Sequence, residues 1–80
     1  MNDTIFLESI LRSVATLPDQ ITLARTEDQR GVLFRVKASK ADMPRLIGKE
    51  GRNIAALRLM MKLYAKDGPN ISVLVEEPAQ

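Results

Sequence analysis

The sequence contains no cysteine, no histidine and no tryptophan. Without cysteine, neither a disulfide nor a thiolate metal site can add stability to the fold. Without histidine, the chain lacks the usual general base near neutral pH and every nucleophile arrangement that depends on one. We therefore expect a protein that is not an enzyme and that uses no metal and no cofactor.

Long apolar runs are also missing. No segment approaches the ~20 apolar residues that a membrane-spanning helix needs. Asp3, Glu8 and Arg12 interrupt the first apolar stretch, and no basic region precedes it, so a secretory signal is not expected. We therefore expect a cytoplasmic protein that does not contact membranes.

The 80 residues that are present, 45% of them hydrophobic and 28% charged, suit one small globular domain. We expect a single domain over residues 1–80 with an ordered core over about 4–76.

Charge is unevenly distributed along the chain. Residues 35–66 contain nine basic residues against Asp42 and Glu50, a net charge of +7, whereas the rest carries −5. This asymmetry fits either a polyanion-binding face or a basic, solvated helix surface.

Apolar periodicity predicts the order helix, strand, strand, helix, helix, strand. The first helix, residues 4–16, is capped by Asp3 and buries a stripe at Leu7, Ile10, Leu11 and Val14. The first strand begins at Ile21, and a polar connection over 27–31 leads to the second strand at 32–38. A short helix capped by Asp42 ends near Ile47, and a last strand covers 71–75. Between them, a longer helix spans 52–66 and buries Ile54, Leu57, Met61 and Tyr64. The tail after residue 77 is expected to be loose.

A glycine-bounded loop, Gly48-Lys49-Glu50-Gly51, separates the two later helices. Its glycines allow a sharp turn and close approach of another backbone, and the N–H groups that begin the following helix favour an anion. An ordinary helix–helix turn would also explain the pair of glycines. A Walker phosphate loop is excluded because its spacing is absent, and a dinucleotide fingerprint is excluded because the loop follows a helix.

The run from Met43 to Ile54, MPRLIGKEGRNI, resembles the I-G-x-x-G core of a KH domain. The element order resembles the bacterial type II arrangement. The length, together with the Leu17-Pro18-Asp19 turn, is similar to the small KhpA-type bacterial KH proteins. The resemblance covers about residues 4–76. It departs from the family at Pro44, where glycine is common, at Leu46, usually valine, and at Glu50, an acid within the loop.

The resemblance implies an α+β fold, a single type II KH domain of order αββααβ with a three-stranded sheet covered on one face by three helices. It also implies a groove for single-stranded RNA between the two central helices and the edge of the second strand. Loop N–H groups would contact phosphates, and an apolar floor would support bases. The expected RNA-binding residues are Arg45, Leu46, Ile47, Gly48, Lys49, Glu50, Gly51, Arg52, Ile54 and Val36.

Several of these residues have a second explanation. Ile47 and Leu57 also suit a simple core position, and Ile54 suits core and groove equally. Glu50 partly cancels the charge of Lys49. Arg58 and Lys62 share one stripe of the long helix, where they either contact phosphate or are merely solvated.

The leading hypothesis is a non-catalytic RNA chaperone or post-transcriptional regulator that binds single-stranded RNA. With only three aromatic residues, base recognition should be shallow. The alternative is an interaction subunit, in which pairing is primary. The family resemblance implies a homodimer or a heterodimer with a KhpB/Jag-type protein. The expected helix 52–66 also carries a second set of apolar residues, which suits either self-association or packing under the first helix: Ala56, Leu59, Met60 and Leu63. Helix-turn-helix binding to duplex DNA is a third class.

Overall fold

The computed structural model describes residues 2–66 and 68–76 of the chain. An α+β fold with a three-stranded sheet is confirmed. The predicted loose tail lies outside the described residues. In chain order, the elements are α1 (Asp3–Val14), η1 (Pro18–Gln20), β1 (Thr22–Asp28), β2 (Gly31–Lys37), α2 (Met43–Ile47), η2 (Lys49–Gly51), α3 (Arg52–Ala65) and β3 (Ile71–Glu76).

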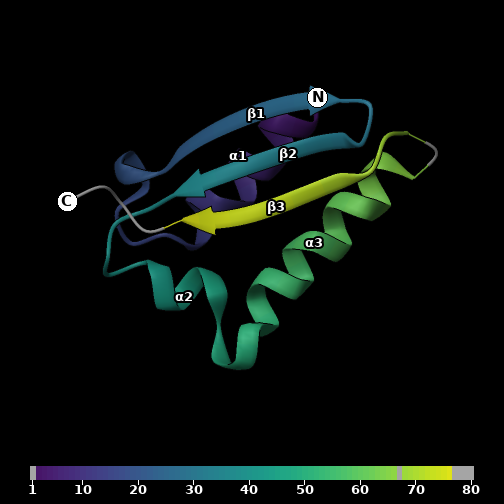
Figure 1. Ribbon diagram of the computed structural model, residues 1–80. Coiled ribbons are helices and arrows are strands. Elements are labelled where there is room, and N and C mark those ends of the chain that lie inside the picture. Colours follow the sequence, from purple (N-terminus) through teal and green to yellow (C-terminus); the bar gives the residue numbers. More distant parts are fainter. Residues whose placement is uncertain (1, 67, 77–80) are drawn as a thin grey trace.

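The central strand of the sheet is β2, which pairs antiparallel with β1 and parallel with β3 (Figure 1). Phe34 in β2 therefore lies opposite Arg25 on one side and Val73 on the other. The prediction that the edge of the second strand borders a groove is wrong, because both edges of β2 are hydrogen-bonded. The strand beside α3 is β3, which pairs on one side only (Figure 1).

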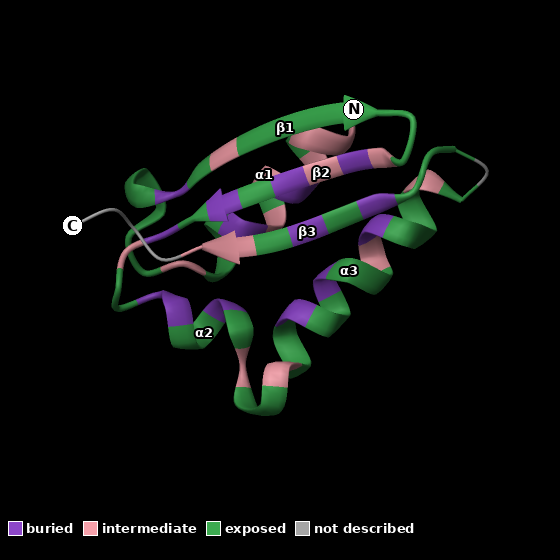
Figure 2. Cartoon of the chain, in the orientation of Figure 1, coloured by how far each residue is buried: buried purple, intermediate pink, exposed green. Residues whose placement is uncertain are grey.

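The core lies between one face of the sheet and the helices. Alternation along β2 buries Val32, Phe34 and Val36 and leaves Arg35 and Lys37 exposed, as the period of two predicts (Figure 2). All three α-helices contribute to the same apolar cluster. Their buried members are Leu7 and Leu11 from α1, Met43 and Leu46 from α2, and Ile54, Leu57 and Met61 from α3.

The start of α1 differs from the prediction. Asn2, rather than Asp3, caps the helix, and its side-chain oxygen accepts a hydrogen bond of 2.8 Å from the Ile5 N–H. Asp3 instead accepts from the guanidinium of Arg25 at 3.0 Å, an ion pair that joins α1 to β1. The helix ends at Val14, which is exposed rather than part of the buried stripe.

The connection between the first two strands is also shorter than predicted. β1 continues to Asp28, and Gly31 pairs directly with it, so Gln29 and Arg30 alone form the turn. At the other end of α3, Tyr64 is partly exposed rather than buried. Its ring stacks on that of Phe6, with centroids 4.7 Å apart, and so joins α3 to α1.

Asp42 stands immediately before α2 but does not cap it. Its carboxylate is fully buried and accepts hydrogen bonds from the N–H groups of Thr16 and Leu17, both at 2.9 Å. The hydroxyls of Thr16 and Ser39 donate to it as well. The hydrogen bond from the Thr16 N–H, followed by that from Leu17, lowers the pKa of Asp42 to about 2, although desolvation opposes this. The carboxylate therefore anchors the segment after α1 to the start of α2.

Candidate nucleic-acid interface

The loop between α2 and α3 has a backbone that most residues avoid. Gly48 has φ 79° and ψ 169°, a conformation essentially restricted to glycine, and Gly51 is left-handed at φ 77° and ψ 18°. Glu50 is left-handed too, at φ 57° and ψ 24°. Each of these three residues therefore helps to reverse the chain between the helices, and only Glu50 carries a Cβ there.

Asn53, in the first turn of α3, fixes this turn. Its side-chain nitrogen donates a 2.6 Å hydrogen bond to the main-chain carbonyl of Arg45 in α2. A Cβ on Gly48 would lie 2.8 Å from the Asn53 N and 2.7 Å from its side-chain Cγ, so a side chain at position 48 is excluded without rearrangement. Asn53 is not among the site residues expected from the sequence. A polar amide two residues after the second glycine is the signal that was available.

Two neighbouring N–H groups of the loop donate to no oxygen within residues 2–66 and 68–76. The Gly48 N–H donates to the Pro44 carbonyl and the Gly51 N–H to the Gly48 carbonyl. Among the described residues, no oxygen accepts from the N–H of Lys49 or Glu50. Both residues are exposed, so these donors face solvent at the point where α3 begins. Free N–H groups beside a helix N-terminus form a favourable place for an anionic oxygen.

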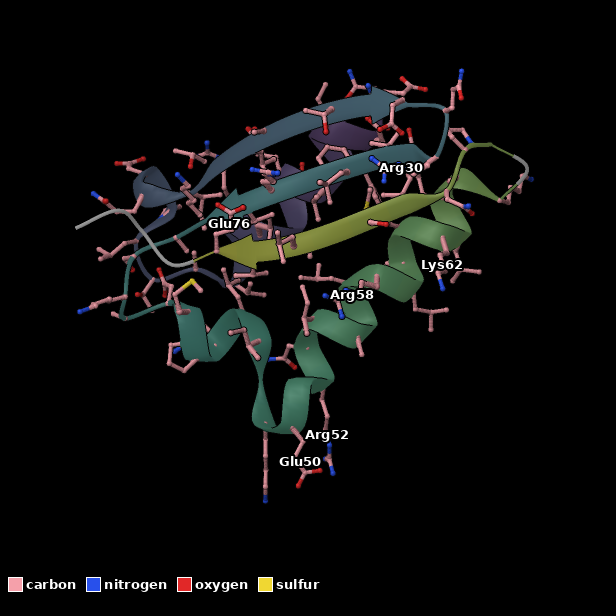
Figure 3. All side chains as sticks on the ribbon, in the orientation of Figure 1. Arg30, Glu50, Arg52, Arg58, Lys62 and Glu76 are labelled. Atoms are coloured by element: carbon pink, nitrogen blue, oxygen red, sulfur yellow. The ribbon has the colours of Figure 1, made fainter. Side chains whose placement is uncertain are left out.

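The cations around the loop are likewise unpaired. Five ion pairs occur in residues 2–66 and 68–76, and all lie in α1, the strands and the hairpin turn. Arg45, Lys49 and Arg52 take part in none of them. Even Glu50 makes no ion pair with its neighbours, and it projects with Arg52 from the loop away from the sheet (Figure 3). The ion pairs of the described residues thus lie away from the loop, and the positive charge beside the loop is available to a ligand.

The four apolar residues expected to form a floor are not equivalent. Ile47 is 37% exposed, beside the loop, and offers apolar surface. Val36, Leu46 and Ile54 are buried in the core. Their side chains are almost fully covered and support the helices from beneath, because the same periodicity that places them near the loop also turns them into the core between helices and sheet.

A shallow depression of about 430 Å³ lies along the junction of α3 and β3. Arg58 and Lys62 project into its margin from α3, and Ser72 and Leu74 line it from β3. Arg58 lies between the helix and the strand (Figure 3), where its Nε and Nη2 donate to the Val73 carbonyl at 3.2 and 3.1 Å. Arg58 is therefore held in place by the strand, unlike the free cations of the loop.

A second surface is apolar. Leu59 and Leu63 on α3 are 59% and 67% exposed, whereas Met60 packs partly against the core. Beside them, a hollow of about 330 Å³ opens where the three helices meet. It is lined by Ile10, Val14, Arg45, Leu46, Asn53, Ala56, Leu57 and Met60. The first helix thus covers only part of the second apolar set predicted on α3.

An α+β domain in which an exposed, glycine-bounded loop joins two helices over a three-stranded sheet has the architecture of a KH domain. A family model described as KhpA/KhpB, KH domain, matches residues 5–76. The chain belongs to this family. Within the described residues, no helix is long and apolar enough to cross a membrane.

Curated relatives agree with this assignment. RNA-binding protein KhpA of Chlamydia trachomatis is 27% identical over 73 residues, which cover 90% of this chain and 94% of the relative. RNA-binding protein KhpA of Oceanobacillus iheyensis is 31% identical over 62 residues, or 78% of this chain and 83% of the relative. The protein of the same name from Clostridium acetobutylicum is 30% identical over 59 residues, or 74% and 79%.

A solved structure shares the fold. The crystal structure of Era in complex with MgGDPNP and nucleotides 1506–1542 of 16S ribosomal RNA matches with a TM-score of 0.71 at 13% identity. The match covers 98% of this chain and 31% of the Era chain. The similarity is therefore one of fold, between this whole chain and about a third of a larger protein.

Proposed function

We propose that this protein binds single-stranded RNA through the loop 48–51 and acts, without catalysis, as an RNA chaperone or post-transcriptional regulator in the bacterial cytoplasm. The observation that carries the proposal is the pair of solvent-facing N–H groups at Lys49 and Glu50, surrounded by the unpaired cations Arg45, Lys49 and Arg52. The curated relatives named RNA-binding protein KhpA support it.

In this proposal, the chain is a single type II KH domain of order αββααβ. Phosphates of the RNA lie against the free N–H groups of Lys49 and Glu50 in the loop 48–51, and Arg45, Lys49 and Arg52 supply the charge. Ile47 provides apolar contact to a base. Leu46, Ile54 and Val36 act from below by holding α2 and α3 in position. The depression along β3 replaces the edge of β2 as the far wall of the groove, because β3 is the strand with a free edge beside α3.

Replacing Lys49 and Glu50 together by aspartate tests the loop. The double variant places two carboxylates against the phosphate path and lowers the net charge by two, so retention of an oligoribonucleotide should fall at least tenfold while the melting temperature is preserved. Arg30→Asp is the matched control, because it makes the same change in net charge on the distant hairpin, where the Arg30 side chain is 92% exposed. Equal losses in both variants would argue against a site at the loop.

Salt dependence gives a second measurement of the same site. If about three phosphates are neutralised, the logarithm of the association constant should fall with the logarithm of salt concentration with a slope of about −2 for a single strand. The measurement should be made with single-stranded and duplex RNA and with duplex DNA. A preference for duplex DNA would instead support the helix-turn-helix hypothesis.

A second candidate function is pairing with another KH protein, as a homodimer or with a KhpB/Jag-type partner. It is supported by Leu59 and Leu63, which are largely exposed on a helix face next to an apolar hollow. Sedimentation of the wild type and of a Leu59→Glu, Leu63→Glu variant tests it. Dissociation of a dimer into monomers is the expected result. A wild type that sediments as a monomer at all concentrations would reject the homodimer.

A further inference from the structure

The exposed edge of β3 is occupied at one position by a side chain of the neighbouring helix. Both Nε and Nη2 of Arg58 donate hydrogen bonds to the carbonyl oxygen of Val73, at 3.2 and 3.1 Å. A carbonyl oxygen has two lone pairs, and two N–H groups here use both of them. No further donor is therefore accommodated at Val73 without displacing Arg58.

The guanidinium of Arg58 retains its other donors. Of the five N–H groups of an arginine, two point at Val73, which leaves the end formed by Nη1 and the second N–H of Nη2. In the part of the chain that the structure describes, Arg58 has no ion-pair partner that would use this end. Besides Arg58, the depression is lined by Lys62, Ser72 and apolar residues of β2 and β3, and none of these is an anion.

We infer that Arg58 makes this depression a base-binding subsite that favours guanine and disfavours adenine. The inference rests on the RNA binding proposed above. Guanine presents two adjacent acceptors, O6 and N7, which match the free end of a guanidinium in a bidentate contact. Adenine instead presents, beside its N7 acceptor, the N6 amino group, which is a donor. At this edge the donor would meet the remaining N–H groups of Arg58 and a Val73 carbonyl that is already engaged.

Lys62 lies one turn further along α3 and has a different role. Its ammonium group is a mobile point charge without the planar fork of arginine, so it attracts phosphate and does not distinguish bases. Arg58 is oriented by Val73 before any ligand arrives. Because of this preorganisation, its contribution should appear as a difference between bases rather than as a general gain in affinity.

The test compares three RNA octamers by fluorescence anisotropy at one salt concentration: octauridylate, and the same octamer with a single guanine or a single adenine near its middle. The wild type should bind the guanine octamer at least about fivefold more tightly than the adenine octamer. In Arg58→Ala this ratio should fall to about one, since the donor fork is lost and the Val73 carbonyl becomes free. The matched control, Lys62→Ala, should weaken binding of all three octamers by a similar factor and keep the ratio.

Two additions keep the test decisive. If Arg58→Ala does not fold, Arg58→Lys retains the charge and should still lose the ratio. In the wild type, the NMR signal of the Arg58 Nε–H should shift more with the guanine octamer than with the adenine octamer. Equal affinity of the wild type for both octamers, or a uniform loss in the Arg58 variants, overturns the selectivity while RNA binding stands. Failure of all three octamers to bind overturns the proposed function and this inference together.

Discussion

The side-chain amide of Asn53 donates a 2.6 Å hydrogen bond to the main-chain carbonyl of Arg45, across the turn that separates α2 from α3. The carbonyl lies in the last turn of α2, where a helix has no internal donor to offer. One side chain thus satisfies an otherwise free acceptor and sets the distance between the two helices that flank the loop.

Asn53→Ala should therefore lower the free energy of unfolding by about 1 kcal/mol, the typical net value of one hydrogen bond. Urea denaturation measures it. At the neighbouring exposed position, the Arg52 side chain makes no hydrogen bond in the described part of the chain, so Arg52→Ala should change stability by less than about 0.5 kcal/mol. Equal effects of the two substitutions would mean that the Asn53 contact contributes nothing.

The two glycines of the loop should differ in their tolerance of alanine. At Gly51, the nearest atom to an added Cβ is Ile54 Cγ2 at 3.8 Å, so the cost is the left-handed backbone alone, about 1–2 kcal/mol. At Gly48, the added Cβ would also lie 2.8 Å from the main-chain nitrogen of Asn53. We expect Gly48→Ala to be clearly the more destabilising in urea or thermal denaturation. The reverse order would contradict the backbone described for this loop.

Glu50 contributes both an unfavourable backbone angle and an unfavourable charge, and two substitutions separate them. Glu50→Gln removes the charge and keeps the left-handed strain, so RNA affinity should rise a few-fold, in line with about 0.5–1 kcal/mol for one screened charge, at unchanged stability. Glu50→Asn also suits φ 57°, because asparagine tolerates this region. It should raise both affinity and melting temperature. Weaker RNA binding by both variants would show that Glu50 contacts the ligand favourably.

Acid should act on the buried carboxylate of Asp42. The pKa of Asp42 is lowered from its usual 3.8 to about 2 in the folded protein, so its contribution to stability is complete above about pH 4 and is lost as the pH falls through about 2. Asp42→Asn, which puts an amide donor among N–H and hydroxyl donors, should be less stable at neutral pH. The gap in melting temperature between the two proteins should narrow from pH 4 to pH 2. A gap of constant size would exclude this linkage.

Local patterns in the sequence predict the order of the helices and strands and the position of the loop between α2 and α3. Alternation placed Val32, Phe34 and Val36 on the inner face, and the glycine spacing located the turn at 48–51. The expected positions of the helix and strand ends were off by a few residues. At the start of α1, Asn2 and Asp3 are both residue types that cap helices well. Asp3 forms an ion pair with Arg25, and Asn2 caps the helix.

Contacts between distant residues could not be predicted in the same way. Asp42 has a sequence suited to capping, but its partners Thr16 and Leu17 lie 26 and 25 residues earlier, beyond the range of any local pattern. Periodicity also does not say which strand stands at the edge of a sheet, so the role of β3 and the Arg58 contact with Val73 were missed. Sequence patterns place Val36 and Leu46 near the loop but do not say which way their side chains point, and in the structure both are buried in the core rather than part of an open floor.

The stack of Tyr64 on Phe6 provides a built-in optical probe. Tyr64 is the only tyrosine and the chain has no tryptophan, so ultraviolet emission excited near 280 nm originates from this one ring. The ring lies thirteen residues along α3 from Gly51, roughly 20 Å at 1.5 Å per residue. Emission should accordingly report the separation of α1 from α3 on unfolding and be insensitive to ligand binding at the loop, so that unfolding of the unlabelled protein can be followed with or without a ligand.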